Sequence, residues 1–85
     1  METKQLVNLA RRQVADLTGQ TVEGISGFHR DDGEGWTVLV EVLELERIPN
    51  TMDLLASYAV TMSDDGDVVG MERRRRYHRA AVDGD

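Results

Sequence analysis

The sequence predicts an α+β fold in which an N-terminal amphipathic helix packs on an antiparallel three- to four-stranded meander sheet. Three observations support this prediction: helical periodicity near the N-terminus, alternating apolar residues in the later segments, and short turn-rich links between those segments. Short links between consecutive strands favour an antiparallel meander, and the helix needs the sheet to bury its apolar stripe. We expect one domain over residues 1–79 and a frayed tail over residues 80–85.

The helix is predicted over Thr3–Thr18. Its apolar residues recur at steps of three and four, which places them on one face; they are Leu6, Leu9, Ala10, Val14 and Leu17. Thr3 is a suitable N-cap, and Gly19 stands where helices commonly end in the left-handed conformation.

The first strand is predicted near Thr21–His29, bent or bulged because Gly24 and Gly27 interrupt it. A turn follows at residues 31–35, and alternation then resumes at Trp36. The apolar phase slips one residue after Val42, and a straight strand on to Ile48 would be about 40 Å long. A β-bulge near residues 42–43 would account for both facts.

The third strand is predicted over Leu54–Ser63, after a loop at residues 48–53 in which Pro49 ends strand pairing. A hairpin turn at residues 64–67 leads to a fourth strand over Val68–Arg79. Shared periodicity predicts one core formed by Trp36, Val38, Val40, Tyr58 and Val60 with Leu6, Leu9 and Leu17.

Composition narrows the function classes. The chain has 85 residues and no cysteine, which excludes disulfides, thiolate metal sites and a cysteine nucleophile. The N-terminus has no apolar signal-peptide region, and no apolar run approaches the roughly 20 residues that span a bilayer. We therefore expect a cytoplasmic protein without a membrane segment.

The net charge of −6 is unevenly distributed. Residues 20–67 hold eleven acidic residues against Arg30 and Arg47, whereas residues 68–79 hold five arginines against Glu72. Such asymmetry suggests a surface that meets a charged partner, including another copy of this chain. The candidate partner-binding residues are Arg73, Arg74, Arg75, Arg76, Arg79 and Arg47.

Three interpretations of the arginine run stay open. The arginines can pair with acids of the same chain such as Glu41, Glu44 and Glu46, bind a protein partner, or bind nucleic acid. In a regular strand, Arg73 and Arg75 would lie on one side and Arg74 and Arg76 on the other. The acidic chain as a whole disfavours general nucleic-acid binding, which needs uncompensated positive charge.

No catalytic, cofactor or metal site is predicted. His29 and His78 lack metal-ligand spacing, and the Asp-Gly segments around Gly33 and Gly66 lack the acid spacing of a calcium loop. Asp-Gly pairs occur in hairpin turns for backbone reasons alone. Because no nucleophile elbow or phosphate-binding loop is present either, we do not expect an enzyme.

Taken together, several segments resemble the gas vesicle protein O family. The most specific stretch is Arg47-Ile48-Pro49 followed by Asp53-Leu54-Leu55-Ala56-Ser57-Tyr58. The other matching segments are Val22-Glu23-Gly24-Ile25, Trp36 through Val42, Glu44-Leu45-Glu46, Ala59-Val60, Asp65-Gly66, Gly70, and Arg73 through Tyr77. The sequence departs from some members by lacking a long charged N-terminal extension.

The resemblance implies a non-catalytic accessory protein for gas vesicle assembly, located with gas vesicles in the cytoplasm. Its partners would be other gas vesicle proteins, bound through a sheet edge and the arginines. The alternative is a regulator of gas vesicle gene expression that binds nucleic acid through Arg73 to Arg79.

Overall fold

The computed structural model describes residues 2–79, which form a helix followed by a four-stranded antiparallel sheet. The elements are α1 (Thr3–Thr18), β1 (Thr21–Arg30), β2 (Trp36–Leu45), the short 3-10 helix η1 (Asn50–Met52), β3 (Leu54–Met62) and β4 (Val68–His78). The strand order β1-β2-β3-β4 confirms the predicted meander and its α+β class. The predicted tail at residues 80–85 lies outside the described residues.

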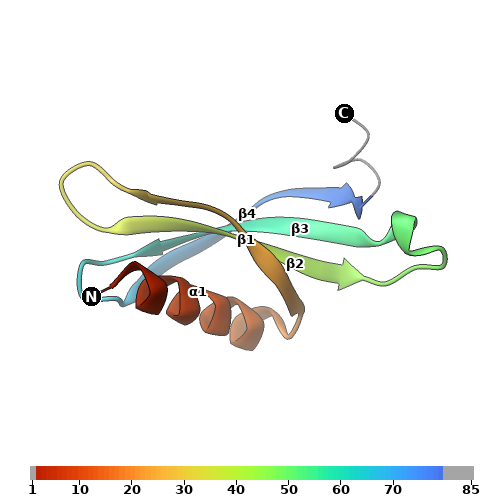
Figure 1. Cartoon of the computed structure of the whole chain (residues 1–85), viewed down its shortest axis with the longest axis horizontal. Helices are drawn as coiled ribbons and strands as arrows, with labels where there is room; N and C mark the ends of the chain where they lie inside the picture. Colours follow the sequence, from red (N-terminus) through yellow and green to blue (C-terminus); the bar gives the residue numbers. More distant parts are fainter. Residues whose placement is uncertain (1, 80–85) are drawn as a thin grey trace.

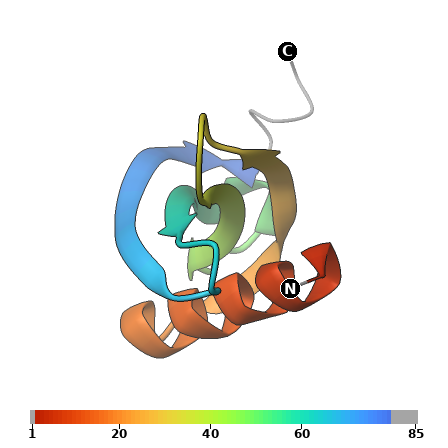
Figure 2. The same ribbon diagram turned by 90° about the vertical axis from the view of Figure 1, so that its left-hand side faces the viewer.

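The helix lies against one face of the sheet, mainly on β1, β2 and β3 (Figure 1). The sheet is strongly curled, and its edge strands β1 and β4 arch toward one another on the side away from the helix (Figure 2). The β1–β2 and β3–β4 turns lie at one end of the long axis, and the β2–β3 loop lies at the other. The face away from the helix is therefore concave and open.

The core lies between the helix and the sheet. Its buried members are Leu6, Ala10, Val14, Val38, Val40, Val42, Ala56, Val60 and Met62, and Leu9, Trp36 and Tyr58 pack against them partly buried. The predicted core is thus confirmed except at Leu17, whose residue surface is 63% exposed. The fully buried helix residues Leu6, Ala10 and Val14 follow steps of four, whereas Leu17 follows Val14 by three and lies at the margin of that row.

The helix ends differ in how well they were predicted. Gly19 ends the helix in the left-handed conformation, with φ of 70°, and its N–H donates to the Ala15 carbonyl. The predicted N-cap Thr3 is wrong, because Thr3 is the first helical residue and Glu2 is the cap. The backbone N–H of Glu2 donates to Oε1 of Gln5 at 3.2 Å.

Bulges interrupt three of the strands. In β2 the register against β3 shifts between Leu43 and Leu45, so the predicted bulge exists but lies at Glu44 rather than at residues 42–43. β2 ends at Leu45, so the strand is shorter than the uninterrupted strand to Ile48 that the sequence pattern would have required. β1 carries shifts at Glu23 and Ser26, as the predicted irregular strand requires.

β4 carries the register shift that matters most for the site. Ser57 of β3 pairs with Arg75 and Tyr58 pairs with Arg73, which leaves Arg74 as the extra residue of a bulge. The bulge breaks the strict alternation along the arginines. Arg73 and Arg76 therefore face the helix side of the sheet, and Arg75 faces the concave side.

A candidate partner-binding surface

The arginine strip, defined as Arg73 to Arg76 with Arg79, is distributed over both faces of the β4 edge. On the helix side, Nη1 of Arg73 lies 3.3 Å and Nε of Arg76 lies 2.7 Å from the carboxylate of Glu44. The Glu44 side chain is only 7% exposed, whereas the two arginine side chains are about half exposed. The predicted pairing of Arg73 with Arg75 on one side is wrong, because the bulge at Arg74 brings Arg73 and Arg76 together.

The remaining arginines occupy separate environments. The Nε of Arg74 lies 3.3 Å from Glu72 in an exposed ion pair. The guanidinium of Arg75 lies over the ring of Tyr77, 4.5 Å from its centroid. Arg47 is exposed in the segment after β2, where its backbone N–H donates to Asp53 at 2.8 Å.

Arg79 joins the two edges of the sheet. Its Nη1 lies 3.0 Å from Glu23 of β1, and its Nη2 lies 3.1 Å from the buried Asp53 that precedes β3. The backbone N–H of Arg79 also donates to the Asp53 carbonyl at 2.9 Å. Hydrogen bonds to Glu23 and Asp53 raise the pKa of Arg79. The two ion pairs link the residue after β4 to β1 and to the residue before β3.

Four of the five arginines of the strip form an ion pair within the chain, and the fifth, Arg75, lies over the Tyr77 ring. The paired carboxylates are those of Glu23, Glu44, Asp53 and Glu72. Of the acids expected from the sequence, Glu44 is among them. The strip is therefore a mixed-charge surface.

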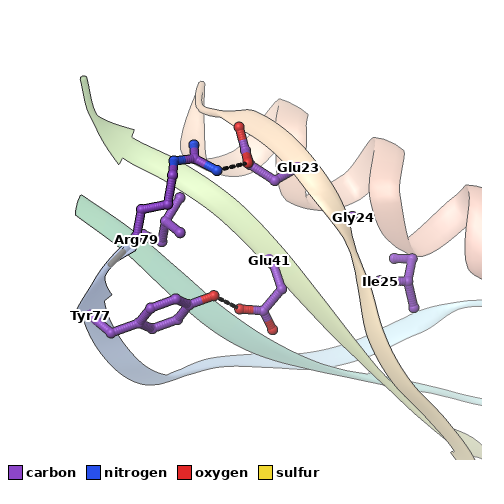
Figure 3. Close-up of a pocket in the computed structure, with 7 residues that line it drawn as sticks. Glu23, Gly24, Ile25, Glu41, Tyr77 and Arg79 are labelled. Atoms are coloured by element: carbon purple, nitrogen blue, oxygen red, sulfur yellow. Dashed lines mark hydrogen bonds and ion pairs between the residues drawn. The ribbon is translucent and has the colours of Figure 1, made fainter. Parts of the chain in front are cut away.

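Sequence reasoning did not find the polar cluster on the concave face beneath Arg79. The hydroxyls of Ser26 and Ser57 donate to the two oxygens of the Glu41 carboxylate, each at 2.6 Å, and the Tyr77 hydroxyl also donates to it. Figure 3 shows Glu41 and Tyr77 pointing toward one another across the sheet. The sequence pattern does not indicate this contact, because the bulge at Ser26 places that side chain on the same face of the sheet as Glu41.

The cluster shifts the protonation equilibria of two groups. Burial raises the pKa of Glu41, but the hydrogen bonds from Ser26, Ser57 and Tyr77, with the charge of Arg75, outweigh it and leave the pKa below its ordinary value. Burial, together with the hydrogen bond to Glu41 and the charge of that group, raises the pKa of Tyr77 to about 12. Glu41 is therefore ionised and Tyr77 is neutral at neutral pH.

The end of β2 and the loop that follows it carry three exposed apolar residues, Leu45, Ile48 and Met52, which we call the loop patch. Their residue surfaces are 45%, 101% and 47% exposed, respectively. Nδ1 of His78 lies 3.2 Å from the Met52 carbonyl oxygen, which places the loop next to the strip. Arginines beside exposed apolar side chains are the composition enriched in protein interfaces.

The described residues give no sign of a metal centre. No group of three or more His, Asp or Glu side chains within residues 2–79 is arranged to hold a metal ion. Asp31 and Asp64, from the two Asp-Gly turns, instead bind Thr37, Arg30 and a backbone N–H. In the part of the chain that the structure describes, no helix is long and apolar enough to cross a membrane.

Comparison with known proteins decides the family. The model of the gas vesicle synthesis protein GvpO family matches residues 1–83. The chain belongs to this family. The resemblance drawn from the segments around Arg47 to Tyr58 is thereby confirmed.

Three curated relatives carry the same name. The chain is 51% identical over 71 residues to gas vesicle protein O of Streptomyces sp. (strain CB03234), covering 84% of this chain and 55% of that protein. It is 39% identical to gas vesicle protein O1 of Halobacterium salinarum, covering 82% of this chain and 58% of that protein. It is 34% identical to gas vesicle protein O of Haloferax mediterranei, covering 82% of this chain and 50% of that protein. The chain thus spans about half the length of these relatives. No solved structure matches the chain.

Proposed function

We propose that this GvpO-family chain is a non-catalytic accessory of gas vesicle formation that binds other gas vesicle proteins, acting with gas vesicles in the cytoplasm. The family name supports the process, since its members are described as gas vesicle synthesis proteins. One observation carries the mode of action: the mixed-charge arginine strip adjoins the exposed loop patch at one end of the molecule.

The binding surface is formed by side chains more than by free backbone. Both edge strands are bulged, β1 at Glu23 and Ser26 and β4 at Arg74 and near Val69. Bulges on an edge strand interrupt the regular row of amides and carbonyls that an added strand would need. A partner that docks on the arginines and on Ile48 fits this arrangement better than strand addition does.

The nucleic-acid alternative receives less support. Nucleic-acid binding relies on cations that neutralise phosphates, and its affinity falls steeply with salt. Four of the five arginines of the strip are already paired with a carboxylate, and Glu44 is shared by Arg73 and Arg76. Phosphates approaching the strip would meet these carboxylates, whereas a protein surface of mixed charge would not be repelled.

A pair of matched double variants tests the proposal. Ile48→Ser with Arg74→Ala removes one exposed apolar and one exposed cationic group from the surface. Val69→Ser with Arg12→Ala makes the corresponding changes, an apolar residue to serine and an arginine to alanine, at positions elsewhere, since Val69 is 65% exposed and Arg12 is exposed on the helix. Each variant is titrated with purified gas vesicle proteins and with duplex DNA or RNA at two salt concentrations.

We expect the first variant to weaken binding to a gas vesicle protein at least tenfold and the second to leave it within twofold. Removal of an interface anchor commonly costs more than about 1.4 kcal/mol, which is tenfold in affinity. Equal binding by both variants would refute the assigned surface. Salt-dependent nucleic-acid binding that only the first variant loses would favour the regulator instead.

A further inference from the structure

The concave face holds a cavity of about 310 Å³ lined by Glu23, Gly24, Ile25, Glu41, Leu55, Tyr77 and Arg79. Its floor is the sheet, and the Arg79–Glu23 ion pair lies across it from one edge strand to the other (Figure 3). Side chains of Leu55 and Tyr77 give it apolar walls. Ligand sites are commonly apolar concavities with a few fixed polar groups, and this cavity has that composition.

The carboxylate of Glu41 is the polar group on which the cavity centres. Its three direct donors are the neutral hydroxyls of Ser26, Ser57 and Tyr77. Among residues 2–79 no cationic group lies within ion-pair distance of it, since the guanidinium of Arg75 rests on the Tyr77 ring. The negative charge is thus held in place by hydrogen bonds and is not neutralised by a contact ion pair.

The carboxylate also keeps room for another donor. Within residues 2–79, Oε1 accepts from Ser57 and Tyr77, whereas Oε2 accepts from Ser26 alone. Each carboxylate oxygen can accept about two hydrogen bonds, so these residues leave one acceptor position of Oε2 unused. A cationic donor there would form a charge-assisted hydrogen bond, which is stronger than a neutral one.

We propose that this cavity binds a lysine or arginine side chain of a gas vesicle protein partner, with the cation on Glu41 and the aliphatic stem along Leu55 and Tyr77. The inference rests on the proposed function for the identity of the partner, but the site itself is defined by the cavity. A basic side chain matches both the apolar walls and the carboxylate of the cavity, because its stem is apolar and its tip is a cation. The aromatic ring of Tyr77 adds a surface on which a cation or its stem can stack.

An organic cation fits this cavity better than a metal ion does. Hard cations such as calcium take six or more oxygen ligands, and in the described part of the chain no three acidic or imidazole groups are arranged to supply them. Glu23, the other carboxylate of the lining, is already paired with Arg79 at 3.0 Å. The charges of Arg79 and Glu23 offset each other, so the lining carries one net negative charge, on Glu41, which suits a single ammonium or guanidinium group.

The test uses small probes, so it does not depend on knowing the partner. N-acetyl-lysine methylamide and N-acetyl-arginine methylamide are titrated into the folded chain and followed by backbone amide NMR. N-acetyl-norleucine methylamide, which keeps the stem and lacks the cation, is the control ligand. We expect saturable millimolar shifts at Gly24, Leu55 and Tyr77 with the cationic probes and none with the neutral probe.

Two variants make the test specific. Glu41→Gln removes the charge and should weaken probe binding at least tenfold, whereas Glu46→Gln, an equal charge change at an exposed position, should not. Gly24→Leu fills the cavity, and its Cβ would meet no atom within 4 Å, so it should abolish binding in a chain that still folds. If Glu41→Gln unfolds the chain, Gly24→Leu still decides the question.

The inference is overturned if the cationic probes cause no saturable shifts, if the neutral probe binds equally well, or if Gly24→Leu leaves binding intact. These results concern the cavity alone. If they occur while Ile48→Ser with Arg74→Ala still abolishes binding of a gas vesicle protein, the proposed function stands without this anchor. Conversely, probe binding that obeys all the controls supports the cavity even if the tested gas vesicle proteins do not bind.

Discussion

Reversing the charge of Arg76 should destabilise the fold, whereas reversing that of Arg74 should not. Arg76→Glu would place a carboxylate beside Glu44, whose side chain is 7% exposed and lies 2.7 Å from the Arg76 Nε. Two carboxylates about 5 Å apart at an effective dielectric constant of about 20 repel by roughly 3 kcal/mol. Because half of the Arg76 side chain is exposed, solvent screening lowers this value, and we expect a loss of about 2 kcal/mol.

Arg74→Glu makes the same charge change at the bulge, where the existing partner, Glu72, is itself 71% exposed. Exposed substitutions usually change stability by no more than about 0.5 kcal/mol. A binding experiment that reverses both arginines would therefore confuse loss of the surface with loss of the fold. Arg74 is therefore the arginine to change in a binding experiment, with Arg76 left in place.

The assay is urea unfolding followed by the fluorescence of Trp36, the single tryptophan. With a denaturant slope of about 1 kcal/mol/M for a chain this small, Arg76→Glu should lower the midpoint by about 2 M and Arg74→Glu by less than about 0.5 M. In a chain that also carries Glu44→Gln, Arg76→Glu should lower the urea midpoint by at most half as much as it does alone. Equal midpoints for the two reversals, or no coupling to Glu44, would refute the argument that the bulge directs Arg76 to a buried carboxylate.

Three further predictions test the core, the polar cluster and a turn. Leu6→Ala should lower the free energy of unfolding by about 2–4 kcal/mol because Leu6 is fully buried, and Leu17→Ala by less than about 0.5 kcal/mol, both measured by urea titration; equal effects would contradict the burial difference. Glu41→Gln should lower the pKa of Tyr77 from about 12 toward 10, followed by NMR of its ring, since the nearby charge is lost; an unchanged pKa would contradict the assigned cause. Gly35→Ala should lower the thermal midpoint, because φ is 81° there and a Cβ would lie 2.7 Å from a carbonyl oxygen of β3; an unchanged midpoint would contradict this packing.

The raised pKa of Tyr77 also determines how the stability of the fold changes with pH. Since the folded pKa of Tyr77 lies above its ordinary value of 10, the cluster stabilises the fold fully below pH 10 and loses this contribution as the pH rises toward 12. The lowered pKa of Glu41 affects the stability of the fold at acidic pH. Its contribution is present above the ordinary pKa of a glutamate and is lost as the pH falls through the folded value.

Much of the fold could be predicted because its determinants are local. The period of the helix, the alternation from Trp36 onward and the Asp-Gly turns each follow from a few adjacent residues. Leu17 shows the limit of this reasoning, since it fits the helical repeat and is nevertheless 63% exposed. The burial of a side chain depends on the tertiary arrangement, which the periodicity of apolar residues does not determine.

The site was harder to predict because strand register decides it. The arginines were recognised from the sequence, but the bulge at Arg74 changes which of them share a face. The cluster on Glu41 joins side chains 15, 16 and 36 residues away in the sequence, through strands whose register includes two bulges. No local pattern contains that information, so the cavity became visible only in the folded chain.

Co-purification from cells that form gas vesicles tests the central claim most directly. The tagged chain, its Ile48→Ser/Arg74→Ala variant and the matched Val69→Ser/Arg12→Ala control are expressed at equal levels, and the bound proteins and nucleic acids are identified. The account predicts that one or more gas vesicle proteins co-purify with the unmodified chain and the control and are depleted at least tenfold from the first variant. Recovery of gas vesicle proteins at equal levels from all three, or of nucleic acid alone, would contradict it.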